Sequence, residues 1–369
     1  MAVVNLIDNR TEFGGLTEHR PLATVPFGGR YRLMDFALSG IVNSGITNVG
    51  ILAPPQQRSL LDHIRSGRDW QLERKRDGLM MLLPPYQQEG QPAGGDLDNF
   101  IANLDYFKKS RQEHVLVTAG NLVGNFDFLE PLQRHTQSGA DITMLYQTQA
   151  AALQDCPNCR LLELDGDNRV KAISENPGAI EGSQANFFLG TFILKKNLLL
   201  KLIKECAAGC RQDSLLQGMA KRLTAYRVQA AAYNGYLARI HCLESYYRHS
   251  LELLNPDIWQ ALFGKSTRIY TKISDEAPTR YSEDARVIRT MVAGGCVIRG
   301  TVEGSILFPR VAIGRGSVVK DSILMFDTYL EDEVLLENVI CDKDVRITRG
   351  RQLGGDAGHP LVLKKGTVV

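Results

Sequence analysis

The sequence lacks the features that would place it in several specialised classes of protein. No apolar run approaches the length that spans a membrane, so we do not expect a membrane protein. Basic and acidic residues nearly balance, 43 against 41, and a net charge of +2 gives no electrostatic reason to expect a nucleic-acid or membrane-surface partner. The first residues also lack the basic region and apolar core of a secretory signal.

Cysteine is sparse as well. Seven cysteines are an odd number and too few for a disulfide scaffold in a chain of 369 residues, which favours a reducing environment and predicts a cytoplasmic protein. Cys156-Pro-Asn-Cys159 has the spacing of half a zinc site or a redox pair, but no second pair at suitable spacing follows. The alternative is a turn between two strands. With 44% hydrophobic residues, the chain can bury a core, and its length favours two domains or one large domain with an appendage.

The texture of the sequence changes along the chain. Over residues 1–255, short apolar runs alternate with apolar residues at helical spacing, which is typical of a mainly parallel sheet covered by helices. A bridging segment follows over residues 256–284, and a repetitive domain over 285–369. The clearest predicted strands are 3–7, 49–52, 114–118 and 141–146, and the clearest predicted helices are 32–44, 97–109 and 243–254.

The repetitive region has a regular period. Apolar residues recur 17 apart, as in Val302, Val319 and Leu336 and again in Ile313, Leu330 and Ile347. Spacings of six also occur, and six residues per flat side with about three sides per coil indicate a left-handed parallel β-helix, here with one shortened corner. The alternative is an ordinary β-rich domain whose spacings coincide by chance. The open ends and flat faces of a β-helix need covering, so we expect an oligomer.

Several motifs resemble one enzyme family. The longest is Pro26-Phe-Gly-Gly-Arg-Tyr-Arg-Leu-Met-Asp-Phe-Ala-Leu-Ser39, and others are Leu82-Leu-Pro-Pro-Tyr86, Asn103-Leu-Asp-Tyr106 and Gly300-Thr-Val-Glu-Gly-Ser305. Because these motifs are spread over essentially the whole chain, the sequence resembles the ADP-glucose pyrophosphorylases, which transfer a nucleotidyl group to a sugar phosphate. The resemblance implies a doubly wound nucleotide-binding sheet followed by a C-terminal left-handed β-helix. In that family the phosphate of glucose 1-phosphate attacks the α-phosphorus of ATP, and Mg²⁺ on carboxylates, cations and a glycine-rich loop neutralise the phosphates.

The positions that should carry this chemistry are replaced. In the register that the resemblance implies, Glu12 takes the place of the loop arginine, and Leu22 and Asn176 each take the place of a lysine. Asn121 falls on the catalytic aspartate and Arg239 on the second metal-binding aspartate. Because an amide is a poor Mg²⁺ ligand and a guanidinium repels the ion, we expect neither a metal site nor a catalytic residue in this chain.

The resemblance therefore implies a degenerate, non-catalytic or weakly catalytic subunit. Such a chain would join a catalytic ADP-glucose pyrophosphorylase subunit in a heterotetramer, form a homo-oligomer when alone, and leave Mg²⁺ to its partner. Glu175 is retained from the sugar-phosphate motif and is the one candidate substrate contact, and His19, Arg20 and Arg30 are candidate contacts for a phosphorylated effector or ordinary surface residues. Two alternatives remain open: an active nucleotidyltransferase with unrecognised metal ligands, and a purely structural subunit.

Two further features have competing interpretations. Asp96 and Asp98 could substitute for the lost metal ligands, but Asp is also favoured at a helix start, where it interacts well with the helix dipole. The basic run from Arg65 to Arg76 contains an aromatic residue and could contact nucleic acid. Its acidic neighbours dilute that charge, so a solvated loop is the preferred interpretation.

Overall fold

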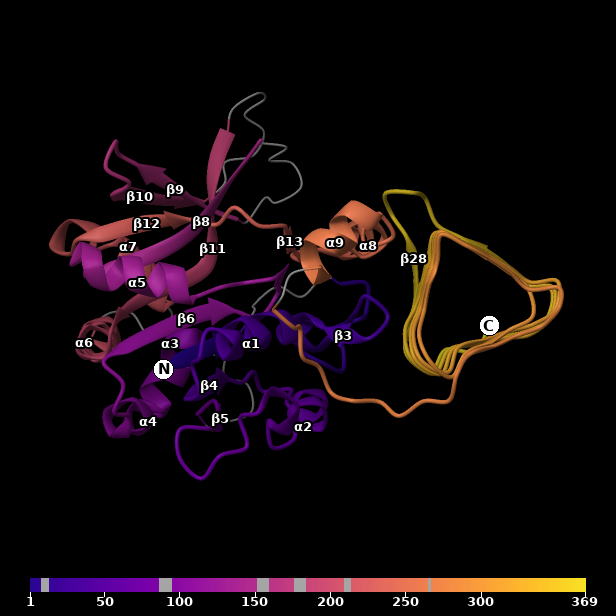
Figure 1. The fold of residues 1–369 in the computed structure, drawn as a ribbon, viewed down its shortest axis with the longest axis horizontal. Coiled ribbons are helices and arrows are strands. Elements are labelled where there is room, and N and C mark those ends of the chain that lie inside the picture. The colour runs from indigo at the N-terminus through magenta and orange to yellow at the C-terminus, as the bar shows by residue number, and fades with distance from the viewer. Residues whose placement is uncertain (8–12, 86–94, 151–158, 176–183, 209–213, 265–266) are drawn as a thin grey trace. The chain divides into compact units, whose positions relative to one another are not determined.

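A computed structural model describes residues 1–7, 13–85, 95–150, 159–175, 184–208, 214–264 and 267–369. The chain forms two compact units, each built from two stretches of sequence (Figure 1). The first unit comprises Met1–Asn9 and Phe36–Gly235, and the second comprises Arg10–Asp35 and Tyr236–Val369.

A mixed sheet forms the centre of the first unit. Nine strands of the described chain belong to it, and its main path runs β10-β9-β11-β6-β1-β4-β5, with β8 on β11 and β12 on β8. Strands β6, β1, β4 and β5 are parallel, and β11 joins them antiparallel. The strands are β1 (Ala2–Asn5), β4 (Val49–Leu52), β5 (Leu79–Leu82), β6 (His114–Ala119), β8 (Ile142–Ala150), β9 (Arg160–Leu164), β10 (Val170–Glu175), β11 (Gln184–Lys195) and β12 (Val228–Ala232).

Helices cover this sheet. The largest apolar cluster joins strand residues to helices α3, α4, α6 and α7 through side chains such as Phe100, Phe107 and Leu202. Burial on both faces explains why the parallel strands are continuous apolar runs instead of alternating patterns. The helices are α1 (Leu33–Asn43), α2 (Arg58–Ile64), α3 (Asp96–Ala102), α4 (Leu104–Lys109), α5 (Leu129–Ser138), α6 (Lys196–Ala207) and α7 (Leu215–Ala220).

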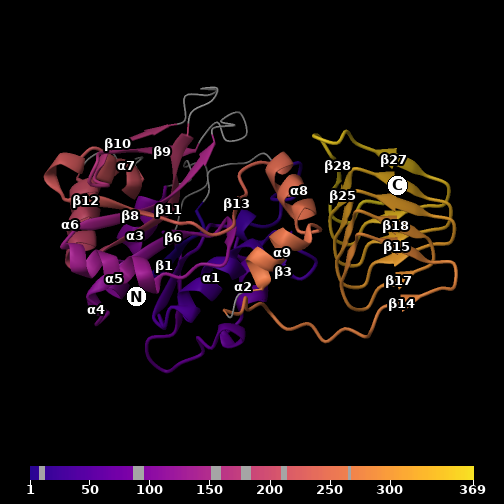
Figure 2. The same cartoon turned by 45° about the horizontal axis from the view of Figure 1, so that its top comes forward.

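Most of the second unit is a parallel β-helix. Three sheets of five short strands each form its sides in the described chain, and the coils superpose as a triangle in Figure 1 and stack in Figure 2. Val302 pairs with Val319 and Val319 with Leu336, which confirms the predicted repeat of 17 residues. The strands of the three sides are β14 (Arg280–Tyr281), β17 (Val297–Ile298), β20 (Ala312–Ile313), β23 (Tyr329–Leu330) and β26 (Arg346–Ile347); β15 (Arg286–Ile288), β18 (Thr301–Glu303), β21 (Val318–Lys320), β24 (Leu335–Glu337) and β27 (Gln352–Gly354); and β16 (Met291–Val292), β19 (Ile306–Leu307), β22 (Ile323–Leu324), β25 (Val339–Cys341) and β28 (Leu361–Leu363).

The corners of the β-helix depend on residues in the left-handed backbone region. Asp321 and Asn338 have φ angles of 42° and 53°, and Gly304 takes the equivalent position one coil earlier with a φ of 59°. Gly tolerates this conformation because it has no Cβ atom to approach the following carbonyl. Asn and Asp tolerate it because their short polar side chains can hydrogen-bond locally. This explains many of the Gly, Asp and Asn residues that separate the apolar positions of the repeat.

The second unit also contains helices and a short hairpin. These are α8 (Leu243–Glu252), α9 (Pro256–Phe263), β2 (Pro26–Phe27) and β3 (Tyr31–Arg32), together with the short strand β13 (Leu237–Arg239). The short strand β7 (Leu122–Gly124) belongs to the first unit. In α9, the Asn255 side chain accepts a hydrogen bond from Asp257 N, and Pro256 occupies the first turn, where no intrahelical N–H is needed. Among the described helices, none is long and apolar enough to cross a membrane.

Candidate functional site

The parallel strands define an edge at which a ligand site is expected. Strands β1, β4 and β6 run in the same direction, so their carboxyl ends at Asn5, Leu52 and Ala119 meet at one edge of the sheet. In α/β sheets, ligands bind at the carboxyl ends of the strands. The residues that follow these three strands are therefore the candidate site of the first unit.

Asn121 lies at this edge. It follows β6 by two residues, precedes β7, and is half-buried. Its side chain offers one amide oxygen and an amide nitrogen but no negative charge. The structure thus places an uncharged side chain at the carboxyl end of a central strand, which is where the resemblance positions a metal-binding aspartate.

Asp96, at the start of α3, has a structural role, because both of its carboxylate oxygens accept hydrogen bonds from the protein. One carboxylate oxygen accepts a hydrogen bond from Asn5 Nδ2 at 2.9 Å, and the other accepts one from Leu215 N at 3.0 Å. Burial raises the pKa of Asp96, and the hydrogen bonds from Leu215 and Asn5 oppose that shift. The carboxylate joins the end of β1 to the starts of α3 and α7, a task that the sequence pattern does not show.

The described residues contain no cluster of side chains suited to a metal ion. In this part of the chain, no three or more His, Cys, Asp or Glu side chains lie close enough together to hold a metal ion. Asn121 and Arg239, which the resemblance aligns with the metal aspartates, supply an amide and a guanidinium. Neither group is a suitable ligand for Mg²⁺, which prefers carboxylate oxygens: the amide carries no charge, and the guanidinium repels the ion.

The other replaced positions are distributed over the chain. Leu22 is 5% exposed in a 3-10 helix at Leu22–Thr24, so an aliphatic side chain fills its apolar surroundings. Arg239 is the last residue of β13 and is half-buried, and its backbone oxygen lies 3.2 Å from His241 Nδ1. Glu12 and Asn176 lie outside the described residues.

Glu175, the candidate substrate contact, ends β10 at the edge of the sheet. Its side chain is 71% exposed, and its carboxylate lies 3.2 Å from the Arg160 guanidinium. Because the Glu175 carboxylate is exposed to solvent, this ion pair contributes little to stability.

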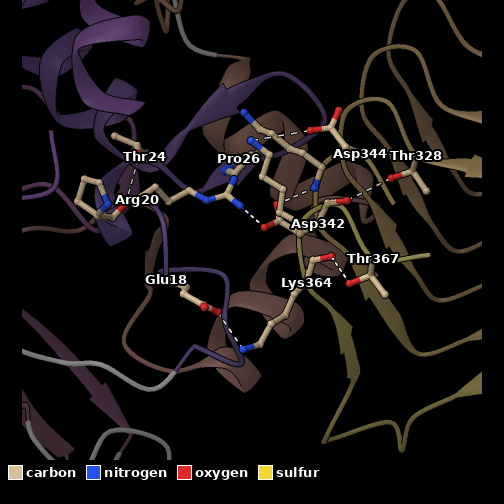
Figure 3. A network of polar contacts seen from close by, with 12 residues as sticks. Glu18, Arg20, Thr24, Pro26, Thr328, Asp342, Asp344, Lys364 and Thr367 are labelled. Atoms are coloured by element: carbon tan, nitrogen blue, oxygen red, sulfur yellow. Dashed lines mark hydrogen bonds and ion pairs between the residues drawn. The ribbon is translucent and has the colours of Figure 1, made fainter. Parts of the chain in front are cut away.

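The three candidate effector residues differ in their surroundings. His19 and Arg30 are exposed, and the Arg30 guanidinium lies 5.9 Å from the centre of the Tyr31 ring. Arg20 is 4% exposed and forms an ion pair with the Asp342 carboxylate (Figure 3). Arg20 is thus not an ordinary surface residue, and the ion pair with Asp342 occupies its guanidinium in this structure.

The cysteine pair is only partly described. Cys159 is buried and disulfide-bonded, and Cys156 lies outside the described residues. The cysteines that are free thiols in the described chain are Cys206, Cys242, Cys296 and Cys341.

Comparison with known protein families agrees with this architecture. The nucleotidyl transferase family matches residues 11–237, and the GlmU-like C-terminal hexapeptide family matches residues 275–361. The first match covers the larger part of the sheet-forming sequence, and the second covers the β-helix. The fold is thus a nucleotidyltransferase domain followed by a left-handed β-helix, as predicted.

Similarity to individual proteins shows to which group of nucleotidyl transferases the chain belongs. The chain is 36% identical to the glycogen biosynthesis protein GlgD of Bacillus subtilis, over 96% of this chain and 92% of that protein. It is 38% identical to GlgD of Geobacillus stearothermophilus over the same shares, and 28% identical to a glucose-1-phosphate adenylyltransferase of Clostridium perfringens over 97% and 92%. The chain therefore belongs to the nucleotidyl transferase family, in the group of glucose-1-phosphate adenylyltransferases (ADP-glucose pyrophosphorylases) and GlgD proteins.

Proposed function

We propose that this chain serves glycogen biosynthesis in the cytoplasm as a subunit that modulates a catalytic glucose-1-phosphate adenylyltransferase and transfers little or no nucleotidyl group itself. Its similarity to two GlgD proteins over nearly their full length supports the pathway. Its similarity to an adenylyltransferase supports the choice of partner. The partner supplies the metal, the phosphate contacts and the turnover.

Asn121 is the observation that carries the non-catalytic part of this proposal. Attack on the α-phosphorus of ATP requires the charge on the phosphates and on the leaving pyrophosphate to be neutralised in the transition state. An amide at the carboxyl end of β6 cannot hold Mg²⁺ as a carboxylate does, and Arg239 adds positive charge at the second metal position. Loss of single groups of this kind typically lowers the rate by orders of magnitude.

Modulation requires a free-energy difference between two states of the partner. In a heterotetramer, this chain would favour the competent state of its catalytic neighbour by binding that state more tightly. Couplings of this kind typically amount to about 1–3 kcal/mol, or roughly 5–150-fold in affinity. We therefore expect the ATP and glucose 1-phosphate saturation curves of the partner to shift within this range when the two chains are co-expressed.

A co-purification experiment with kinetics tests the proposal against a purely structural role. A complex with shifted saturation curves supports modulation. A complex with unchanged curves shows a scaffold subunit and contradicts the proposal. Isothermal titration of this chain alone with ATP and Mg²⁺ tests the catalytic side, since tight, metal-dependent binding would show a working nucleotide site that we do not expect.

A further inference from the structure

Residues 13–35, which we call the strap, lie on the outside of the β-helix within the second unit. Glu18 accepts a hydrogen bond from Lys364 Nζ at 2.9 Å (Figure 3). Tyr246 of α8 donates a hydrogen bond to the Pro26 oxygen at 2.7 Å. A Cβ atom at Gly14 would lie 2.9 Å from the Val362 side chain, so the strap and the β-helix pack here without space for a larger residue.

The surface under the strap is apolar and fully buried. Leu307, Leu324 and Cys341 point into the core of the β-helix, so the residues next to them in the sequence point outward. Those outward residues would normally meet water, yet each is 0% exposed: Ile306, Phe308, Ile323, Met325 and Ile340. This side of the β-helix is therefore a second apolar interface, formed inside one unit.

Asp342 breaks the apolar pattern of this interface. It follows Met325 by one coil of 17 residues, and Met325 in turn follows Phe308 by 17, because Leu324 pairs with Cys341 and Leu307 with Leu324. The repeat thus replaces a large apolar side chain with a carboxylate. Side-chain exposure is only 1% for Asp342 and 5% for its partner Arg20, and the second carboxylate oxygen accepts a hydrogen bond from Lys343 N at 2.7 Å.

A second cation lies beside this carboxylate. The Lys343 ammonium stands 4.9 Å from the centre of the Phe326 ring. Burial, followed by the positive charges of Arg32 and Arg20, lowers the pKa of Lys343 to about 8, and the negative charge of Asp342 opposes that shift. Asp342 therefore compensates positive charge on both the strap and the β-helix.

We propose that Asp342 acts as a built-in anion that latches the strap onto the β-helix through Arg20, so that the strap stays attached without any bound ligand. Removing the carboxylate leaves the buried Arg20 guanidinium without its partner beside the half-buried Lys343, and a buried charge without its partner is strongly destabilising. The interface then opens, or it recruits an anion from solution.

Hydrogen–deuterium exchange of the full chain tests this latch. In Asp342→Asn, we expect amides of residues 13–35 to exchange at least about 100-fold faster than in the wild type, since a broken buried pair typically costs that much in local opening. Inorganic phosphate at constant ionic strength should slow this exchange in Asp342→Asn and leave the wild type unchanged. Glu18→Gln is the matched control, because it removes an exposed strap contact and should behave like the wild type.

A second variant covers the case in which Asp342→Asn does not fold. Arg20→Met with Asp342→Leu removes both charges and restores an apolar residue to the repeat, so we expect a folded chain with a protected strap and no response to phosphate. The proposal is overturned if Asp342→Asn exchanges no faster in the strap than Glu18→Gln. Failure of phosphate to slow exchange in a folded Asp342→Asn chain would equally contradict the role of Asp342 as an anion.

Discussion

Two histidines in the first unit lie inside the protein without full hydrogen bonding. His135 of α5 is 2% exposed, its Nδ1 lies 2.8 Å from Thr143 Oγ1, and its ring centre is 5.3 Å from that of His114. Within the described chain, Nε2 of each ring is buried without a partner. Burial, followed by the neighbouring charges of His114 and Lys195, lowers the pKa of His135 to about 4, with Asp141 opposing.

This lowered pKa predicts a loss of stability in mild acid. The unfolded chain binds a proton on His135 near pH 6.5, whereas the folded chain does so only near pH 4. Between these values the unfolded state binds more protons, so stability is full above about pH 6.5 and falls as the pH drops, by at most about 1.4 kcal/mol per pH unit for one group. Urea unfolding of His135→Gln from pH 7 to 4 should show a shallower fall than the wild type. An unchanged slope would contradict the assignment, and exposed His19→Gln is the control.

Arg20 shows how far a single residue can be predicted from sequence. The sequence suggested an effector contact or an ordinary surface residue, and it did not suggest an ion pair with Asp342, which is 322 residues away and falls at an apolar position of the repeat. Sequence spacing describes only contacts along one element, whereas a buried ion pair depends on which distant segments meet. The repeat did contain a signal, because a carboxylate one coil after Met325 needs a cation when it is buried.

At the scale of elements, buried serines hold one corner of the β-helix. Ser322 is 0% exposed; its hydroxyl donates to Lys320 O at 2.6 Å and accepts from Val339 N at 3.1 Å. Ser322→Ala should cost about 1–3 kcal/mol, because the buried Val339 N–H loses its acceptor. Thermal unfolding measures this loss. Arg349→Ala, which removes an exposed pair with Glu333, is the control and should leave the midpoint unchanged; equal shifts would show that the serine bond is unimportant.

Asp96 makes the corresponding prediction for the first unit. Asp96→Ala should destabilise the chain by about 1–3 kcal/mol, because Asn5 Nδ2 and Leu215 N both lose an acceptor. Asp98→Ala, in the same first turn of α3, should cost less, since it alters only the favourable charge at the helix start. Urea unfolding compares the two variants. Equal losses would show that the helix dipole explains both residues.

The elements themselves were largely predictable. A repeat of 17 residues predicts the β-helix, because each coil must place its apolar residues over those of the coil before it, and the observed pairs of Ile313 with Leu330 and Leu330 with Ile347 confirm this register. The strap was not predictable. Its hairpin at Pro26–Phe27 and Tyr31–Arg32 has no periodicity of its own, and its place depends on an interface with residues far along the chain.

At the scale of the whole molecule, the residues that maintain the fold are different from those that the resemblance assigns to the chemistry. The motifs that resemble the family include Gly28 and Gly29, whose φ angles of 58° and 70° require glycine for the backbone turn, so they preserve structure. In the register that the resemblance implies, the positions that would carry charge to the phosphates and the metal are the ones that differ. Sequence reasoning could locate Asn121 at a strand end, but it could not assign a task to Asp96, because Asn5 and Leu215 are distant in sequence.

The most direct test of the account is pyrophosphate release from ATP, glucose 1-phosphate and Mg²⁺, measured with this chain alone, a catalytic adenylyltransferase alone, and the two co-expressed. We predict no turnover above background for this chain alone, and a rate or an apparent affinity for the mixture that differs from that of the catalytic chain. Robust turnover by this chain alone would contradict the account, because it would require metal ligands other than those at Asn121 and Arg239.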